Sequence, residues 1–381
     1  MINFKYNLET NIRFGIGERK YLNNIILKEK FKAVCVVIDK ALVGLPMFIE
    51  LMNTVKCATA LIECDISEPT YENLEEKRKF IKKENFDAFI GIGGGSAMDM
   101  AKGLSVLYTN KKSAILYRGF EEFNKPIKPI IAIPTTAGTG SEITPNASFV
   151  DTLQKKKMGI NGNAIRPIHA ILDPELTISC PKQPTISAGV DSLVHATEAY
   201  VAKNSNKLAK MFAKEGFNIV FENLPLLITQ LNNIELRQNV MYGSFLSSIA
   251  LMHSGTGPAA AMSYPLGVHF GVPHGIGGGI FLPYVIKHNI DAGFFNYADI
   301  IRTKNCKDIK YKSAKIFLEQ IRIKWKELEI PNNLKKYGMG KKHIGMFKKD
   351  VMELKSALNH NPVPFAEKEI SNVLRELINN N

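Results

Sequence analysis

The sequence predicts an α/β domain built on a parallel sheet, followed by a helical domain. The first half alternates short apolar runs with segments rich in lysine and glutamate, and helical periodicity takes over after the prolines at 181 and 184. A chain of 381 residues is also long enough for two domains. We therefore place the first domain at residues 1–182 and the second at residues 183–381.

Three apolar runs are the expected strands of the first domain. They cover residues 32–39, 86–92 and 129–134, and helical segments such as 71–85 separate them. Strands without polar alternation are typical of a parallel sheet that helices cover on both faces. In the second domain, helical periodicity predicts helices over residues 186–202, 208–221, 236–252 and 370–378.

Composition indicates a packed, water-soluble protein. Apolar residues make up 45% and charged residues 22%, and the 49 basic and 36 acidic residues give a net charge of +13. A basic surplus can attract an anionic substrate or nucleic acid, but these basic residues are scattered and no nucleic-acid-binding module is present, so a solvated surface is favoured. No apolar stretch is long enough to cross a membrane or to act as a signal peptide.

The cysteines favour a reducing, cytoplasmic location. They are odd in number and widely spaced, and no C-x-x-C pair suggests zinc or a redox couple. The five are Cys35, Cys57, Cys64, Cys180 and Cys306.

A glycine turn follows the second expected strand. Gly93, Gly94, Gly95 and Ser96 come directly after residues 86–92 and precede a helical segment. Glycines let the backbone approach a pyrophosphate, and the free N–H groups at a helix start bind its charge. The spacing differs from G-x-G-x-x-G, so a plain tight turn remains the alternative.

Two further features support a dinucleotide site. A polar turn at residues 134–142 follows the third expected strand, and loops after the carboxyl ends of parallel strands converge on one crevice. Asp39 ends the first strand, where an acid would bind the adenosine ribose and repel a 2′-phosphate, which favours NAD over NADP. The alternative for Asp39 is an acid that caps the following turn.

Three residues form a candidate metal site. Asp191 and His195 are four apart in a helical segment and project from one face, and His274 offers a third donor. Two histidines and one carboxylate are a known metal arrangement. Such pairs also occur by chance, so the spacing alone leaves the metal open.

These residues and several others together resemble the iron-containing alcohol dehydrogenase family over nearly the whole chain. The segments that carry the resemblance are 14–17, 93–102, 133–144, 173–177, 189–200, 265–267, 273–275 and 361–362.

The resemblance implies a Rossmann-like N-terminal domain and a helical C-terminal domain, the fold that dehydroquinate synthase shares, with NAD or NADP bound in the cleft between them. It implies hydride transfer between an alcohol and the nicotinamide, a small-molecule alcohol or aldehyde as substrate, and a homo-oligomer such as a dimer. The metal ligands fall on Asp191, His195 and His274, with iron or zinc as the ion. The implied cofactor contacts are Asp39, Gly94, Gly95, Ser96, Asp99, Thr135, Thr136, Thr139 and Lys157.

The sequence departs from the family where a further histidine ligand is expected. That position holds Ala260, and the histidine usually found before Pro265 is Tyr264. His253 lies seven residues before Ala260, about 10 Å along a helix, too far to replace the ligand, whereas His269 remains a candidate substitute.

Three alternatives follow from this departure. In the first, three ligands hold a metal, and a chelating hydroxy acid or vicinal diol takes two open positions. In the second, no metal binds, and Tyr264 or His269 acts as catalytic acid or base. In the third, hydride chemistry is lost. Tyr264 as an ordinary packed aromatic is the competing interpretation of that residue.

The segment 263–267, together with residues 116–120 and 157–160, is similar to a branch of the family that oxidises a sugar acid, the 3-deoxy-octulosonate 8-dehydrogenases. Such an anionic substrate suits a basic protein. Alternatives of a different class are a lyase-type cyclase related to dehydroquinate synthase and a catalytically silent NAD-binding protein.

Overall fold

The computed structural model describes residues 4–65, 68–82, 84–301 and 310–380. Two compact units are present: an α/β unit, Asn7–Cys180, and a helical unit made of Pro181–Asn381 together with the N-terminal residues up to Tyr6. The ring of Tyr6 stacks on His253 with 4.6 Å between centroids, which is why this N-terminal residue groups with the helices.

The α/β unit is organised around a six-stranded sheet in which every neighbouring pair is parallel. The three apolar runs of the sequence are its adjacent strands β6, β4 and β2. In sheet order the strands are β1 (Asn11–Phe14), β9 (His169–Leu172), β6 (Ile130–Pro134), β4 (Ala88–Gly93), β2 (Ala33–Asp39) and β3 (Ala58–Cys64).

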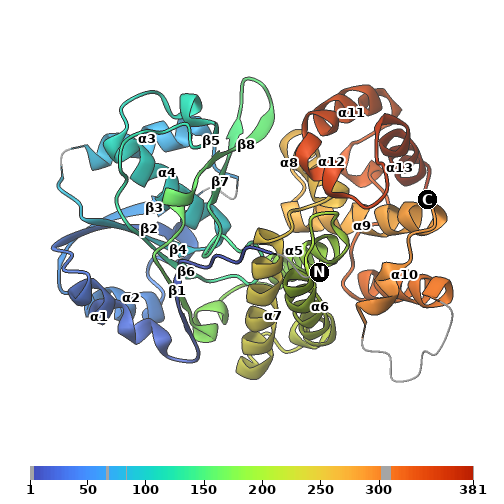
Figure 1. The fold of residues 1–381 in the computed structure, drawn as a ribbon. Coiled ribbons are helices and arrows are strands. Elements are labelled where there is room, and N and C mark those ends of the chain that lie inside the picture. The colour runs from blue at the N-terminus through green and yellow to red at the C-terminus, as the bar shows by residue number, and fades with distance from the viewer. Residues whose placement is uncertain (1–3, 66–67, 83, 302–309, 381) are drawn as a thin grey trace. The chain divides into compact units, whose positions relative to one another are not determined.

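Helices bury both faces of this sheet (Figure 1). Cys35 and Val37 of β2 pack in one core with α3 (Tyr71–Ile81) and α4 (Gly95–Thr109). Val34 and Val36 point the other way, into a core with α1 (Leu22–Lys28) and α2 (Pro46–Thr54). Because successive side chains of a strand face opposite sides, a strand covered twice needs apolar residues throughout, as β2 has.

A smaller, three-stranded sheet that the sequence analysis does not predict lies beside α4. It consists of β5 (Gly119–Phe120), β8 (Lys156–Asn161) and β7 (Asn146–Asp151), with β7 and β8 antiparallel. Ala147 and Phe149 of β7 enter the core that contains α4. The strand β8 begins with two lysines, which hides its strand character in the sequence.

The helical unit contains the predicted helices and several more. The predicted ones are α5 (Lys182–Val201), α6 (Lys207–Leu227), α7 (Ile234–Met252) and α13 (Glu367–Asn379). The others are α8 (Pro258–Phe270), α9 (His274–Asp291), α10 (Lys310–Glu327), α11 (Ile344–Glu353) and α12 (Lys355–His360). Helix α8 escapes a search for amphipathic periodicity because Ala259–Ser263 are buried in succession.

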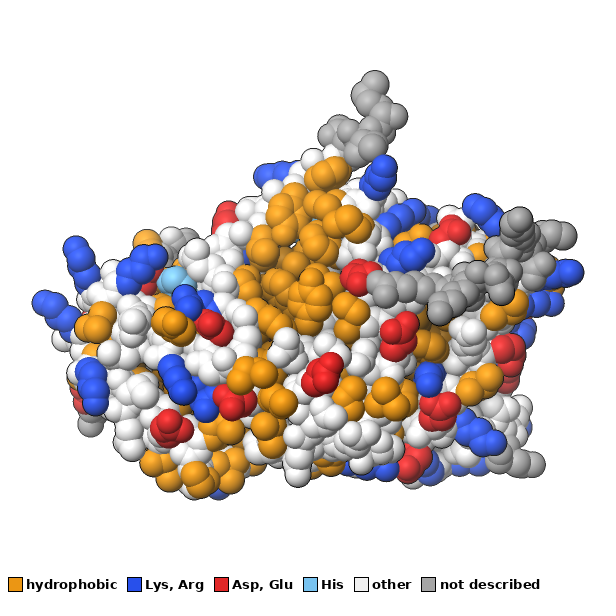
Figure 2. All heavy atoms as spheres, turned by 90° about the horizontal axis from the view of Figure 1, so that it is seen from below, with side chains coloured by type: hydrophobic (Ala, Val, Ile, Leu, Met, Phe, Trp, Pro, Cys, Tyr) orange, Lys and Arg blue, Asp and Glu red, His pale blue; other side chains and the backbone are white. Residues whose placement is uncertain are grey.

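The predicted fold class, a parallel α/β part followed by a helical part, is confirmed. No helix in the described ranges combines the length and hydropathy that a bilayer crossing requires. On the face drawn in Figure 2, lysine and arginine side chains are interspersed with acidic ones. Cys306 falls outside the described residues, and the other four cysteines form no disulfide with one another.

Candidate functional site

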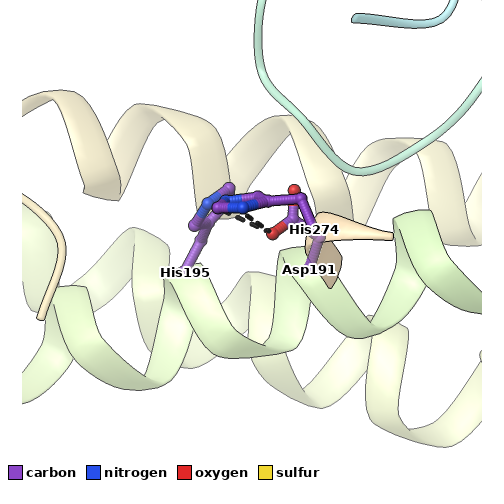
Figure 3. A group of neighbouring side chains, drawn as sticks. All are labelled: Asp191, His195 and His274. Atoms are coloured by element: carbon purple, nitrogen blue, oxygen red, sulfur yellow. Dashed lines mark ion pairs between the residues drawn. The ribbon is translucent and has the colours of Figure 1, made fainter. Parts of the chain in front are cut away.

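Asp191, His195 and His274 form a compact group in the helical unit (Figure 3). Asp191 and His195 lie one turn apart on α5, and His274 is the first residue of α9. The Oδ1 atom of Asp191 is 3.5 Å from His195 Nε2 and 3.8 Å from His274 Nε2, and one donor atom of each residue lies within 4.8 Å of the other two. Two ligands bonded to one ion at 2.0–2.2 Å are roughly 3.5 Å apart, so this group has the dimensions of a metal site.

Close packing of α9 against α5 brings His274 to the other two residues. A Cβ atom added at Gly275 would lie 2.9 Å from Asp191 Cβ and closer still to the carbonyl oxygen of Ser187. One turn later, a Cβ at Gly279 would lie 2.6 Å from Val190 Cγ1. Glycines therefore let the two helices approach at the turn that carries the ligands.

Two residues of α8 contact the imidazole of His274. The Oγ atom of Ser263 lies 2.6 Å from His274 Nδ1, and the Tyr264 ring centroid lies 4.9 Å from that of the imidazole. Because Nδ1 faces Ser263, the Nε2 atom is the one turned toward Asp191.

Glu198 holds the start of α8. Its carboxylate accepts hydrogen bonds from the N–H groups of Gly257 and Ala259, both at 2.7 Å, and of Ala260 at 3.4 Å. Burial, with a smaller contribution from the charge of nearby Asp191, raises the pKa of Glu198 to about 7 against the opposing effect of these bonds. Since Glu198 follows His195 by three residues on α5, it fixes the first turn of α8 beside the metal group.

In the α/β unit, the glycine turn and the second polar turn lie against each other. A Cβ on Gly95 would lie 2.9 Å from Thr139 Cγ2, and one on Gly94 would lie 3.6 Å from Thr136 Oγ1. The N–H of Thr135 donates to Gly93 O at 2.9 Å. This contact follows from the pairing of β4 with β6, which end side by side.

Asp39 ends β2 next to the glycine turn, since a Cβ on Gly93 would lie 2.9 Å from Asp39 Cβ. Its Oδ1 atom accepts a hydrogen bond from Ala41 N at 3.0 Å and caps the turn that follows. The alternative of a capping acid is thus realised, at a position that also borders the glycine turn.

Asp99 and Ser96 both belong to α4, which begins at the glycine turn. Asp99 Oδ1 accepts from Ser141 Oγ at 2.6 Å and Oδ2 from Ser148 N at 2.9 Å. Lys102 is fully buried and donates to Ser141 Oγ at 2.9 Å, and burial lowers its pKa to about 8. This network ties α4 to the second polar turn, so Asp99 supports the loops with both of its carboxylate oxygens.

The remaining predicted residues lie in different surroundings. Lys157, on β8, pairs with Glu68 at 2.6 Å. His269, in the last turn of α8, pairs with Asp350 at 2.8 Å and is not part of the metal group. It follows Ala260 by nine residues, about 13 Å along the helix, which accounts for that separation.

Two family models match this chain. The model of the iron-containing alcohol dehydrogenases matches residues 9–174, and the C-terminal model of the Fe-containing alcohol dehydrogenase family matches residues 185–378. The chain belongs to the iron-containing alcohol dehydrogenase family.

Three relatives illustrate the similarity. An NAD-dependent methanol dehydrogenase of Bacillus methanolicus is 35% identical over 61% of each chain, so less than two thirds of that relative is spanned. A 1,3-propanediol dehydrogenase of Citrobacter freundii is 29% identical over 81% of this chain and 80% of its own. The crystal structure of a sulfoacetaldehyde reductase from Bifidobacterium kashiwanohense in complex with NAD+ superposes with a TM-score of 0.91, at 26% identity over the whole of both chains.

Membership in the family confirms the predicted family and the prediction of an oxidoreductase of the alcohol dehydrogenase type. A lyase-type cyclase and a silent NAD-binding protein are correspondingly disfavoured.

Three supporting residues have no role in the sequence analysis. Glu198, Ser263 and Ser141 were all inside segments that resemble the family. For Glu198 a signal is available, because a carboxylate that lies close to Ala196, Ala199 and Val201 in the sequence needs partners when it is buried. Ser263 and Ser141 give no such signal, since a serine in a helix or turn is ordinary.

Gly275→Ala should displace His274. The added methyl group overlaps the Ser187 carbonyl, so α9 must move away from α5 at a cost of roughly 1–3 kcal/mol. We expect a lower melting temperature and zinc binding weakened on the order of tenfold or more, measured by chelator competition. Gly345→Ala, on α11 with no atom within 4 Å of the added methyl, is the matched control and should leave both unchanged. Wild-type zinc affinity in Gly275→Ala would contradict this account.

The pKa of Glu198 predicts a pH effect on stability. The folded protein holds the proton up to about pH 7, whereas the unfolded chain releases it near 4.5, so this contribution is present at low pH and is lost as pH rises through that window. Glu198→Gln cannot titrate. The measured quantity is the unfolding free energy of metal-free wild type minus that of metal-free Glu198→Gln. It should fall by roughly 3 kcal/mol as the pH rises through this window.

Urea titrations at several pH values would measure this difference. Glu222→Gln, an exposed position on α6, serves as control and should give no comparable trend. A difference that stays constant, or rises, with pH would show that Glu198 is ionised in the folded state.

Proposed function

We propose that this protein interconverts an alcohol and its carbonyl compound, with NAD as hydride carrier and a divalent metal ion held by Asp191, His195 and His274. The observation that carries the proposal is the convergence of these three donors within 4.8 Å, in a chain of the iron-containing alcohol dehydrogenase family. Family relatives with NAD in their names or bound in their structures support the choice of cofactor.

The donor set suits iron or zinc. Imidazole nitrogens with a carboxylate oxygen bind both ions, whereas magnesium and calcium prefer oxygen alone. A divalent ion at this position supplies Lewis-acid polarisation of the alcohol or carbonyl oxygen. Burial of Asp191 and His195, which are 4% and 5% exposed, excludes water from the ligand atoms and strengthens every electrostatic interaction there.

We propose a substrate with two neighbouring oxygens. Ala260, which is buried in the first turn of α8, has a methyl group where the family resemblance implies a further imidazole. Three protein ligands leave more than one coordination position open, and a vicinal diol or a hydroxy acid could occupy two of them. A sugar acid such as 3-deoxy-octulosonate fits this description and the basic charge of +13.

The α/β unit supplies the proposed NAD site. Helix α4 begins at Gly95, its N-terminal dipole end suits a pyrophosphate, and Thr136 and Thr139 border the same turn. Gly94, Ser96, Thr135, Asp99 and Lys157 complete the proposed contacts. Asp39 is placed to accept hydrogen bonds from the adenosine ribose.

Of the two proposed acid–base residues, Tyr264 is favoured. Its ring contacts His274, whereas the imidazole of His269 is engaged by Asp350. We infer that the Tyr264 phenol, beside His274, exchanges the proton that enters or leaves the substrate oxygen.

The proposal includes a cytoplasmic homodimer. The cysteines at 35, 57, 64 and 180 form no disulfide with one another, which suits a reducing compartment. A broad area of hydrophobic side chains is exposed on the face in Figure 2, and large exposed hydrophobic residues include Phe4, Tyr6 and Met211. Such exposure is typical of association surfaces, and sedimentation velocity would report the oligomeric state.

Metal removal should abolish the reaction. We expect NADH formation to stop after dialysis against a chelator and to return with Fe²⁺ or Zn²⁺, because the substrate oxygen otherwise lacks polarisation. Asp191→Asn should lower kcat/KM on the order of 100-fold. Asp291→Asn, at an exposed acid on α9, is the matched control and should retain activity.

A substrate panel tests the chelation proposal in the same assay. Vicinal diols and hydroxy acids, 3-deoxy-octulosonate among them, should give higher kcat/KM than ethanol or propanol. Equal rates with all substrates would contradict the proposal of a chelating substrate. Activity that survives thorough metal removal would contradict the proposed role of the metal. If no substrate of the panel gave NADH, the proposed dehydrogenase activity would be contradicted.

Asp39→Ser should weaken discrimination between the two pyridine nucleotides. Serine can still accept the Ala41 N–H bond but carries no charge to repel a 2′-phosphate. We expect the ratio of the NADP+ to the NAD+ dissociation constant to fall on the order of tenfold, measured by calorimetry. Asp65→Ser removes a nearby exposed charge as control, and an unchanged ratio in Asp39→Ser would show that Asp39 only caps its turn.

A further inference from the structure

The hydroxyl group of Ser263 contacts two possible hydrogen-bond partners, and it has a single proton to donate. Ser263 is buried in α8, at 1% exposure. Its Oγ atom lies 2.6 Å from the carbonyl oxygen of Ala260 and 2.6 Å from Nδ1 of His274. Both separations are those of short hydrogen bonds.

These two contacts determine where the protons are. A carbonyl oxygen only accepts, so the Ser263 hydroxyl must donate its proton to Ala260. The oxygen then has only lone pairs left for His274, and Nδ1 must carry the proton that it donates to Ser263. A neutral imidazole with its proton on Nδ1 has its lone pair on Nε2.

We propose that Ser263 is a positioning residue that holds neutral His274 in the Nδ1–H tautomer and so presents the Nε2 lone pair to a divalent cation. The inference rests on the proposed metal site. The Nε2 atom is the one that lies 3.8 Å from Asp191 Oδ1, so the tautomer puts the lone pair on the side of the other donors.

Local packing supports this role. A Cβ on Gly277 of α9 would lie 3.0 Å from Ser263 Cβ, so the glycine allows α8 to come close enough for the bond to His274. By contrast, Nδ1 of His195 is buried and finds no hydrogen-bond partner among the described residues. Of the two imidazoles, His274 is therefore the one whose tautomer this contact selects.

The tautomer can be read directly in the metal-free, full-length protein. Two-bond nitrogen–proton correlation spectra of histidine-labelled protein, at a pH well above the ordinary imidazole pKa, separate the two tautomers, and His274→Gln assigns the signal. We expect Nδ1–H in wild type and a mixed or Nε2–H signal in Ser263→Ala. Ser263→Cys, which keeps a side chain of the same connectivity but is a weak acceptor, should follow Ser263→Ala.

Zinc affinity, measured by chelator competition, should fall 10- to 100-fold in Ser263→Ala. Ser248→Ala is the matched control, because Ser248 is equally buried in a helix and its hydroxyl donates only to Ser244 O. That variant should keep wild-type affinity and tautomer, which excludes a general effect of losing a buried hydroxyl.

Several outcomes would overturn the proposal. The proposal fails if His274 keeps the wild-type tautomer in Ser263→Ala. It also fails if the zinc affinity of Ser263→Ala stays within about twofold of wild type. Zinc binding that fails in wild type would overturn the metal site instead, and the spectra of metal-free protein would still decide what Ser263 does to His274.

Discussion

The contact between the first turn of α9 and the middle of α5 is the constraint on which the helical unit's chemistry depends. Asp191 and His195 are neighbours by helical geometry alone, but His274 is nearly eighty residues away in the chain and reaches them only because α9 lies against α5. The Ser187 carbonyl sits where a side chain at Gly275 would be, so no residue other than glycine fits without moving the ligand. A glycine in a helix lowers its stability by roughly 1 kcal/mol relative to alanine. Here the close packing of α9 against α5 offsets that cost.

Buried ionisable side chains hold the two candidate sites in shape. In the helical unit, Glu198 satisfies the N–H groups at the start of α8, which has no side-chain cap of its own. In the α/β unit, Lys102 and Asp99 meet at Ser141 and fasten the second polar turn to α4. A buried ionisable group that lost its partners would cost several kcal/mol, so each network tolerates little local movement.

The sequence was sufficient for those parts of the structure that depend on short-range patterns. Apolar runs without alternation predicted β2, β4 and β6 as central parallel strands, and the i, i+4 spacing predicted that Asp191 and His195 share a face. The small sheet with β7 and β8 was not predicted, because polar residues at the start of β8 mask its pattern. Ser263 and Glu198 act across helix contacts, and such contacts depend on tertiary packing that periodicity does not describe.

The alanine at position 260 lowers the number of protein donors near Asp191, His195 and His274, but it leaves the hydrogen bonds at the start of α8 in place. Hydrogen bonds from backbone N–H groups to Glu198 hold the first turn of α8, and they do not involve the side chain of residue 260. The group is therefore a set of three donors beside a turn of α8 that Glu198 holds. Fewer protein ligands mean weaker intrinsic affinity for the ion and more open coordination. A substrate that contributes two oxygens would then bind the ion and complete its coordination together, which couples metal retention to substrate binding by mass action.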